Sequence, residues 1–138
     1  MAILYKLFQD KRESQPTFGK WFAQTVRPQQ VDLEWISQKI QDNTSVKRAD
    51  VWAVLIELVE VMSQCLHEGW VVNIDRLGVF RVYLNSKGAD SREAFDERKN
   101  ITGAHVRFMP KMVWYGSHKG SHRNHKLIDG FDVKEIPF

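Results

Sequence analysis

Hydrophobic and polar positions change their period along this chain, and the changes predict its elements. Residues 3–8 and 20–26 are short runs rich in aromatic and β-branched side chains. The polar segment between them predicts a loop or wide hairpin turn. Pro28 disfavours helix at the residue before it. Residues 1–30 are therefore predicted to form a β-type extension.

Helical spacing follows this extension. Leu33, Ile36 and Ile40 recur at a helical period over residues 31–43, and Asp32 is a suitable N-cap. After a break at residues 43–45, where Ser45 can cap the next element, a second helix is predicted to end at Gly69. Its apolar stripe consists of Val51, Val54, Leu55, Leu58, Met62 and Leu66, and it is widened by Trp52, Ile56, Val59 and Cys65. A helix that is apolar over so much of its circumference must be covered on several sides.

Beyond Gly69 the period becomes two, which is typical of strands. Residues 70–74 and 79–84 predict two strands joined by a tight turn at residues 76–78, and residues 104–109 predict a third. A long polar arm, residues 85–100, connects the second and third strands. The predicted fold class is α+β: a helix-turn-helix pair followed by a three-stranded antiparallel sheet with a β-arm. The predicted domain organisation is an extension (1–30), a core (31–110) and a tail (111–138), whose glycines argue against a long final helix.

Length and composition allow one compact domain with extensions, because the chain has 138 residues, of which 43% are hydrophobic and 27% charged. Its single cysteine, Cys65, excludes an intramolecular disulfide framework. The amino terminus becomes charged before a signal-length apolar region develops. Glu57 and Glu60 interrupt the longest apolar stretch, so no transmembrane segment is predicted. These features predict a soluble, cytoplasmic protein.

Charge is unevenly distributed along the chain, whose net charge is +3. Residues 31–69 contain seven acidic and three basic side chains, whereas residues 70–110 contain seven basic and five acidic ones. A basic surface favours a polyanionic partner. A nucleic-acid surface is therefore predicted in the second part of the core.

The outward face of the predicted sheet concentrates basic groups. Arg81 and Tyr83 alternate with apolar residues on one strand, Lys87 continues it, and Arg107 has the outward position on the next. Guanidinium and ammonium groups pair with phosphate oxygens and release condensed counterions. The alternative is an ordinary solvated strand face, which also carries charged residues. Charge alone does not decide between the two.

The segment from Val31 to Pro110 resembles the core of the HU/IHF family of bacterial histone-like proteins. Two helices are followed by a strand, by the turn Leu77-Gly78-Val79-Phe80, and by VRFMP at residues 106–110, which resembles the strand returning from the family's arm. The N-terminal segment ending in FAQTVRPQQVDL resembles a subgroup of HU-related proteins that carry such an extension.

This resemblance implies an intertwined dimer whose sheets form a saddle and whose β-arms wrap the DNA minor groove. It places Arg92, Arg98 and Lys99 on the arm. The resulting DNA-binding set is Arg76, Arg81, Tyr83, Lys87, Arg92, Arg98, Lys99 and Arg107. The expected function is that of a nucleoid-associated architectural protein, a homodimer that binds double-stranded DNA largely without sequence specificity.

The arm departs from the family pattern. The family's arm tip usually carries a proline that wedges between base steps and kinks the DNA. Here the arm reads SKGADSREAFDERKN, which contains no proline and four acidic residues. We therefore expect weaker bending than in relatives, with DNA contacts mostly on the saddle.

Other chemistries find little support in the sequence. No nucleophile–base pair, carboxylate dyad or phosphate-cradling glycine loop is visible, so no enzyme, cofactor or small-molecule substrate is expected. His118, His122 and His125 have helical spacing, but Gly116 and Gly120 oppose that helix, and no metal site is predicted.

The remaining alternative is a scaffold for protein–protein contacts with weak or no DNA binding. Phe95 on the arm, with Trp114 and Tyr115 beyond it, would then anchor a protein partner. Retardation of random-sequence duplex at low salt separates this alternative from DNA binding.

Overall fold

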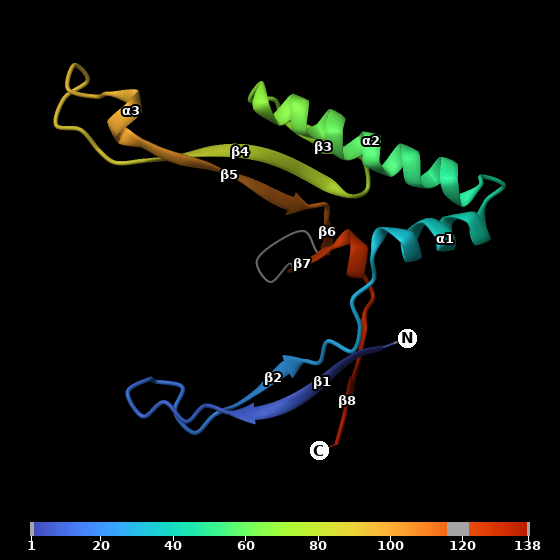
Figure 1. The fold of residues 1–138 in the computed structure, drawn as a ribbon. Coiled ribbons are helices and arrows are strands. Elements are labelled where there is room, and N and C mark those ends of the chain that lie inside the picture. Colours follow the sequence, from blue (N-terminus) through green and yellow to red (C-terminus); the bar gives the residue numbers. More distant parts are fainter. Residues whose placement is uncertain (1, 116–121, 138) are drawn as a thin grey trace. The chain divides into compact units, whose positions relative to one another are not determined.

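The computed structural model describes residues 2–115 and 122–137. The chain forms two compact units (Figure 1). One unit combines both ends of the chain, Met1–Ile36 and Gly130–Phe138, and the other contains Ser37–Asp129. No described helix is long and apolar enough to cross a membrane.

The terminal unit contains a three-stranded sheet in the order β2-β1-β8, formed by β1 (Ala2–Gln9), β2 (Trp21–Thr25) and β8 (Asp132–Glu135). The predicted N-terminal hairpin is confirmed, because β1 and β2 pair antiparallel with Gln9 opposite Trp21. Strand β8 pairs parallel with β1 and was not predicted. Its four residues carry no strong strand pattern, and its partner lies at the other end of the sequence.

The loop between β1 and β2 is organised around the buried carboxylate of Asp10. This carboxylate accepts hydrogen bonds from Arg12 Nε at 3.0 Å, Arg12 Nη2 at 2.9 Å, Arg12 N at 3.0 Å and Thr17 Oγ1 at 2.6 Å. These donors hold the pKa of Asp10 well below its usual range, because they stabilise the ionised form. The loop therefore has a defined hydrogen-bonded structure.

Helix α1 (Leu33–Asn43) begins as predicted, since Asp32 Oδ1 accepts a hydrogen bond from Trp35 N at 2.8 Å. Helix α2 (Arg48–His67) begins differently. The expected cap at Ser45 is wrong, because the N-cap is Lys47, whose side chain makes no capping bond. Instead, Gln41 Oε1 accepts from Arg48 N at 2.7 Å, so a side chain of α1 satisfies the first amide of α2.

Gly69 ends α2 as predicted, with a left-handed φ of +74°. Its amide donates to Leu66 O at 3.0 Å, and the amide of Trp70 donates to Cys65 O at 2.9 Å, which is the Schellman pattern. Because Trp70 belongs to this helix ending, β3 starts at Val72 rather than at residue 70.

The core unit contains an antiparallel sheet in the order β3-β4-β5, formed by β3 (Val72–Ile74), β4 (Gly78–Ser86) and β5 (Ile101–Pro110). The three predicted strands are thus present. Residues 111–138, expected as a tail, also contain a hairpin of β6 (Met112–Tyr115) and β7 (His122–His125), followed by the 3₁₀ turn η1 (Lys126–Ile128). The arm carries the short helix α3 (Glu97–Asn100), which was not predicted.

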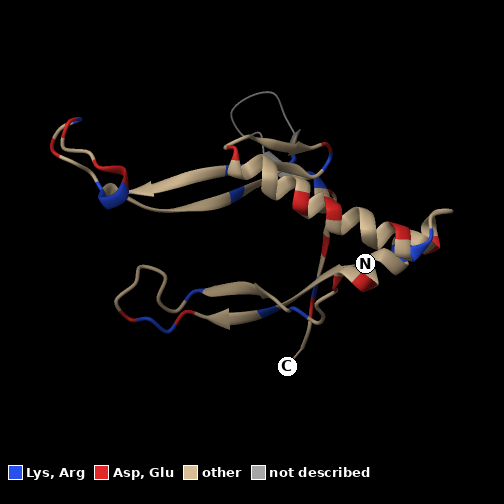
Figure 2. Cartoon of the chain, turned by 45° about the horizontal axis from the view of Figure 1, so that its top comes forward, with Lys and Arg blue, Asp and Glu red and all other residues tan. Residues whose placement is uncertain are grey.

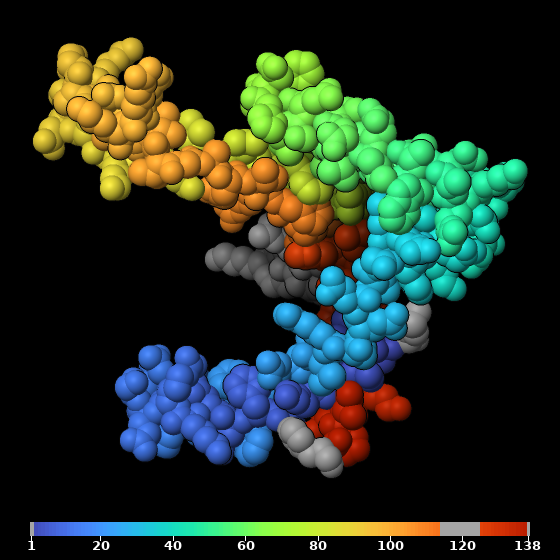
Figure 3. Space-filling model, in the orientation of Figure 1, coloured from blue at the N-terminus to red at the C-terminus, as the bar shows by residue number. Residues whose placement is uncertain are grey.

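Apolar side chains of the core unit are poorly covered. Val51, at 7% exposure, is the one apolar side chain that counts as buried among the described residues. On α2, Val54 is 66% exposed and Val59 is 63% exposed, and on β4 Leu84 is 63% exposed. The space-filling view shows the arm standing clear of α2 (Figure 3). The core unit thus leaves much of its apolar surface exposed.

Candidate nucleic-acid interface

The two faces of the β4–β5 ladder differ in chemistry. Arg81 lies opposite Arg107, and Tyr83 lies opposite His105. The intervening pairs are Phe80 with Phe108, Val82 with Val106, and Leu84 with Ala104. Paired residues in an antiparallel ladder share a face, and successive residues alternate between faces. One face is therefore basic and aromatic and the other apolar, as the sequence predicted.

Arg81 and Arg107 place two cations at directly opposite positions. Both side chains are exposed, and like charges at opposite positions destabilise a ladder. Arg12 and Asp10, which form an ion pair at 2.9 Å, lie in a part of the sequence far from this ladder. An anion bound at this ladder would relieve the repulsion, and a phosphate group accepts hydrogen bonds from guanidinium groups well.

His105 and Asn85 extend this face towards the arm. The rings of Tyr83 and His105 stack with centroids 5.7 Å apart and an interplanar angle of 19°. His105 Nδ1 lies 2.8 Å from Asn85 Oδ1. The sequence interpretation gave His105 no role, although its position two residues before Arg107 signals the shared face.

The arm is closed by Asn100. Its side-chain nitrogen Nδ2 donates to Lys87 O at 3.1 Å, and its side-chain oxygen Oδ1 accepts from Asp96 N at 2.9 Å. Lys87 N in turn donates to Asn100 O at 2.7 Å. Asp96 Oδ1 accepts from Arg98 N at 2.9 Å and so caps α3. These bonds give the arm a defined local structure.

The predicted binding residues do not all gather in one place. Arg81, Tyr83 and Arg107 share one face of the ladder, while Lys87 lies where the arm begins. Arg98 and Lys99 lie on α3, and Arg92 lies in the loop before it, and acidic residues are interspersed with these bases along the arm (Figure 2). Arg76 lies in the β3–β4 turn, at the end of β4 away from the arm, with a left-handed φ of +67°.

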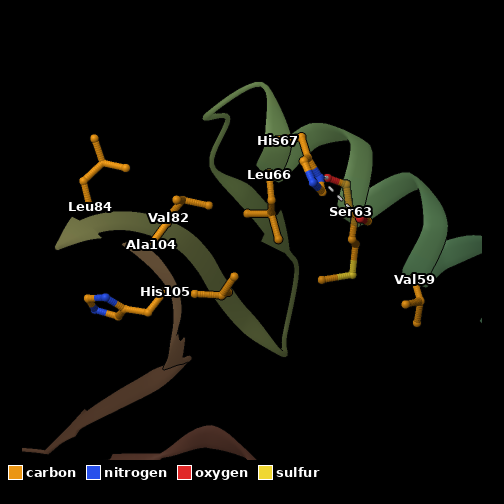
Figure 4. Close-up of a pocket in the computed structure, with 10 residues that line it drawn as sticks. Val59, Ser63, Leu66, His67, Val82, Leu84, Ala104 and His105 are labelled. Carbon is orange, nitrogen blue, oxygen red and sulfur yellow. Dashed lines mark hydrogen bonds between the residues drawn. The ribbon is translucent and has the colours of Figure 1, made fainter. Parts of the chain in front are cut away.

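An open cleft of about 550 Å³ lies between the apolar face of the ladder and the C-terminal half of α2 (Figure 4). The cleft is lined by Val59, Met62, Ser63, Leu66 and His67 from α2 and by Val82, Leu84, Ala104, His105 and Val106 from the sheet. Most of these side chains are apolar. The cleft suits an apolar segment of a protein better than a charged ligand.

No group of three metal-binding side chains occurs among the residues that the structure describes. The histidine triplet of the sequence cannot be placed, because His118 and the side chain of His122 lie outside the described residues. The side chains of Trp114 and Tyr115 also lie outside them. Phe95 is described, and it is 44% exposed on the arm.

The chain is similar to a solved structure, that of a candidate bacterial DNA-binding protein from Bacteroides vulgatus ATCC 8482. The TM-score is 0.63 at 16% sequence identity, and the match covers 98% of this chain and 48% of the other. This chain thus spans about half the length of that structure, and the likeness concerns the fold. No curated protein matches the chain significantly.

A family model does match, over residues 1–124. The family is HU-HIG, described as an HU domain fused to wHTH, Ig, or glycine-rich motif. The match covers most of the chain and includes the N-terminal hairpin as well as the segment that resembles HU in sequence. The chain belongs to the HU-HIG family.

Proposed function

We propose that this protein is a non-enzymatic architectural protein that binds double-stranded DNA largely without sequence specificity, as a homodimer, on the bacterial nucleoid. The observation that carries the proposal is the Arg81–Arg107 pair, two exposed cations held side by side on one face of β4–β5. Exposed cations of this kind suit contacts to phosphates, which are the same in every sequence.

The comparisons support the DNA-binding part of this proposal. The family is named for its HU domain, and the similar Bacteroides vulgatus structure is described as a candidate DNA-binding protein. The IHF-like saddle is a proposal that rests on the order of two helices, a three-stranded sheet and a long arm.

A second copy of the chain is the proposed occupant of the open cleft. Val59 of the cleft is 63% exposed, and Val54 and Val61 elsewhere on α2 are 66% and 45% exposed. Covering such side chains stabilises an assembly by about 25 cal/mol per Å² of apolar surface removed from water. An intertwined homodimer would place the apolar stripe of one α2 against that of the other.

The arm supports weak bending within this proposal. It lacks proline, and Asp90, Glu93, Asp96 and Glu97 oppose its approach to phosphate. Unstacking a base step costs a few kcal/mol, which additional wrapped contacts must offset. Contact is therefore proposed to concentrate on the β4–β5 face.

The test compares the double variant Arg81→Ala/Arg107→Ala with Arg81→Lys/Arg107→Lys on random-sequence duplex over a range of salt. Each phosphate neutralised contributes about 0.9 to the slope of log affinity against log salt. A homodimer has two such pairs, so the alanine variant should lose up to about 3.6 of slope. The lysine variant keeps the charges and should retain most of that slope.

Two results would count against this surface. Full affinity in the alanine variant would place the DNA elsewhere, and a loss confined to one sequence would contradict sequence-independent binding. If wild-type protein fails to retard duplex at low salt, the scaffold alternative replaces DNA binding.

A further inference from the structure

One face of the terminal unit's sheet carries an aromatic pair with lysines on either side of it, and Asp132 of β8 shares this face with Lys134. Phe8 lies opposite Phe22, and the next pair on the same face is Lys6 with Gln24. Beyond that pair, Leu4 lies beside Lys134 of β8. We call Lys6, Phe8, Lys20, Phe22 and Lys134 the aromatic–lysine face.

Lys20 belongs to this face through the continuation of the ladder. Asp10 N donates to Lys20 O at 2.9 Å, one pair beyond the Gln9–Trp21 pair. Because side chains alternate along an extended strand, Lys20 lies on the side of Phe22 rather than that of Trp21. The lysines therefore lie on both sides of the aromatic pair along the strands.

The two rings are accessible. Phe8 is 43% exposed and Phe22 is 37% exposed, and their centroids lie 5.9 Å apart with an interplanar angle of 32°. Phenylalanine side chains are commonly buried, so an exposed pair on a sheet surface suggests a ligand with its own apolar, planar surface.

The charge of the chain points to the same part of the molecule. Residues 1–30 carry five Lys or Arg side chains against two carboxylates, while the remainder of the chain carries fifteen of each. The net charge of +3 therefore resides in the N-terminal segment. One of its two carboxylates, Asp10, is already paired with Arg12 at 2.9 Å.

We propose that the aromatic–lysine face binds single-stranded nucleic acid, with unpaired bases stacked on Phe8 and Phe22 and backbone phosphates held by Lys6, Lys20 and Lys134. Aromatic rings on a positively charged surface bind single strands because every base has a π-face. In a duplex those base faces are covered by neighbouring bases. This site shares no residue with the Arg81–Arg107 ladder and does not rest on the proposed duplex binding.

The experiment measures fluorescence anisotropy of a labelled oligo(dT) of about 12 nucleotides, a length within the usual site size, titrated with full-length protein at low salt. Phe8→Leu/Phe22→Leu keeps apolar side chains but removes both rings. Since each stacked base contributes about 1–3 kcal/mol, this variant should bind at least about 30-fold more weakly. Circular dichroism checks that it folds.

A second pair of variants tests the lysines and does not disturb the rings. Lys6→Gln/Lys20→Gln should weaken binding and lower its salt dependence. The matched control Lys47→Gln/Lys126→Gln removes the same charge from exposed positions outside the terminal sheet and should bind like wild type. The comparison of these two lysine variants tests the proposed site even if the leucine variant does not fold.

The variant Arg81→Ala/Arg107→Ala, which tests duplex binding, is also titrated with the oligonucleotide. It should keep single-strand binding while losing duplex affinity. The proposal is overturned if wild type does not bind the oligonucleotide, if the two lysine variants bind equally, or if Arg81→Ala/Arg107→Ala removes single-strand binding. Failure of duplex binding alone would overturn the proposed function and leave this site standing.

Discussion

Gly78 begins β4 at a position where no side chain fits. Its φ is +151°, and a Cβ built there would lie 2.3 Å from Met109 O, 2.9 Å from Pro110 Cα and 2.7 Å from Phe108 Cε2. Two of these three atoms belong to the backbone of β5 and cannot rotate away. Gly78→Ala therefore forces β4 and β5 apart at the end of the ladder where Gly78 pairs with Pro110.

The size of the effect follows from two costs. A backbone conformation that L side chains rarely adopt costs about 1–3 kcal/mol, and displacing a packed strand costs about 1–3 kcal/mol more. Gly78→Ala should thus lower the free energy of unfolding by roughly 2–6 kcal/mol, a large share of the about 5–15 kcal/mol of a typical domain. Gly88→Ala is the matched control, because nothing lies within 4 Å of its added Cβ.

Urea denaturation followed by circular dichroism measures the effect, with the chain concentration held constant because association stabilises the folded state. For a slope of about 1–3 kcal/mol per molar urea, the midpoint of Gly78→Ala should fall by at least about 0.7 M. Gly88→Ala should change the unfolding free energy by no more than about 0.5 kcal/mol. Equal midpoints for the two alanine variants would refute the steric reasoning.

Three further predictions follow from other parts of the chain. Val59→Asp puts a charge on an exposed apolar position of α2, so sedimentation equilibrium at low micromolar concentration should change from twice the chain mass to the chain mass; an unchanged dimer would remove α2 from the proposed subunit contact. Asp10→Asn should speed tryptic cleavage after Lys11 and Arg12 at pH 7, with Asp90→Asn as control. Because the pKa of Asp10 is lowered on folding, its ionised carboxylate stabilises the loop fully at neutral pH. This stabilisation is lost only as the pH falls below about 3.9, the pKa of an ordinary Asp. Equal cleavage of both variants would contradict the role of Asp10 in ordering the loop. End-to-end energy transfer on a duplex of about 35 base pairs should show a small bend that Phe95→Ala leaves unchanged, whereas a large bend lost in Phe95→Ala would identify Phe95 as a wedge.

Much of the core was predictable because its signals are local. The Asp32 cap and the Gly69 ending are decided by the sterics and hydrogen bonds of a single turn, and both are confirmed. The alternation around Arg81 correctly predicted the face that Arg81 shares with Tyr83. The Ser45 cap failed because a side chain from the preceding helix, Gln41, supplies the acceptor.

Unlike caps and helix endings, the pairing of strands and their register cannot be predicted from neighbouring residues alone. Periodicity assigns Arg81 and Arg107 to outward faces, but only the β4–β5 register puts them directly opposite each other. In the same way, only the folded structure pairs β8 with β1 and so adds Lys134 to the face of Phe8 and Phe22. Caps, glycine endings and strand alternation depend on a few neighbouring residues, so the sequence by itself determines them. Strand partners depend on competition among all possible pairings, which is resolved only when distant segments pack together.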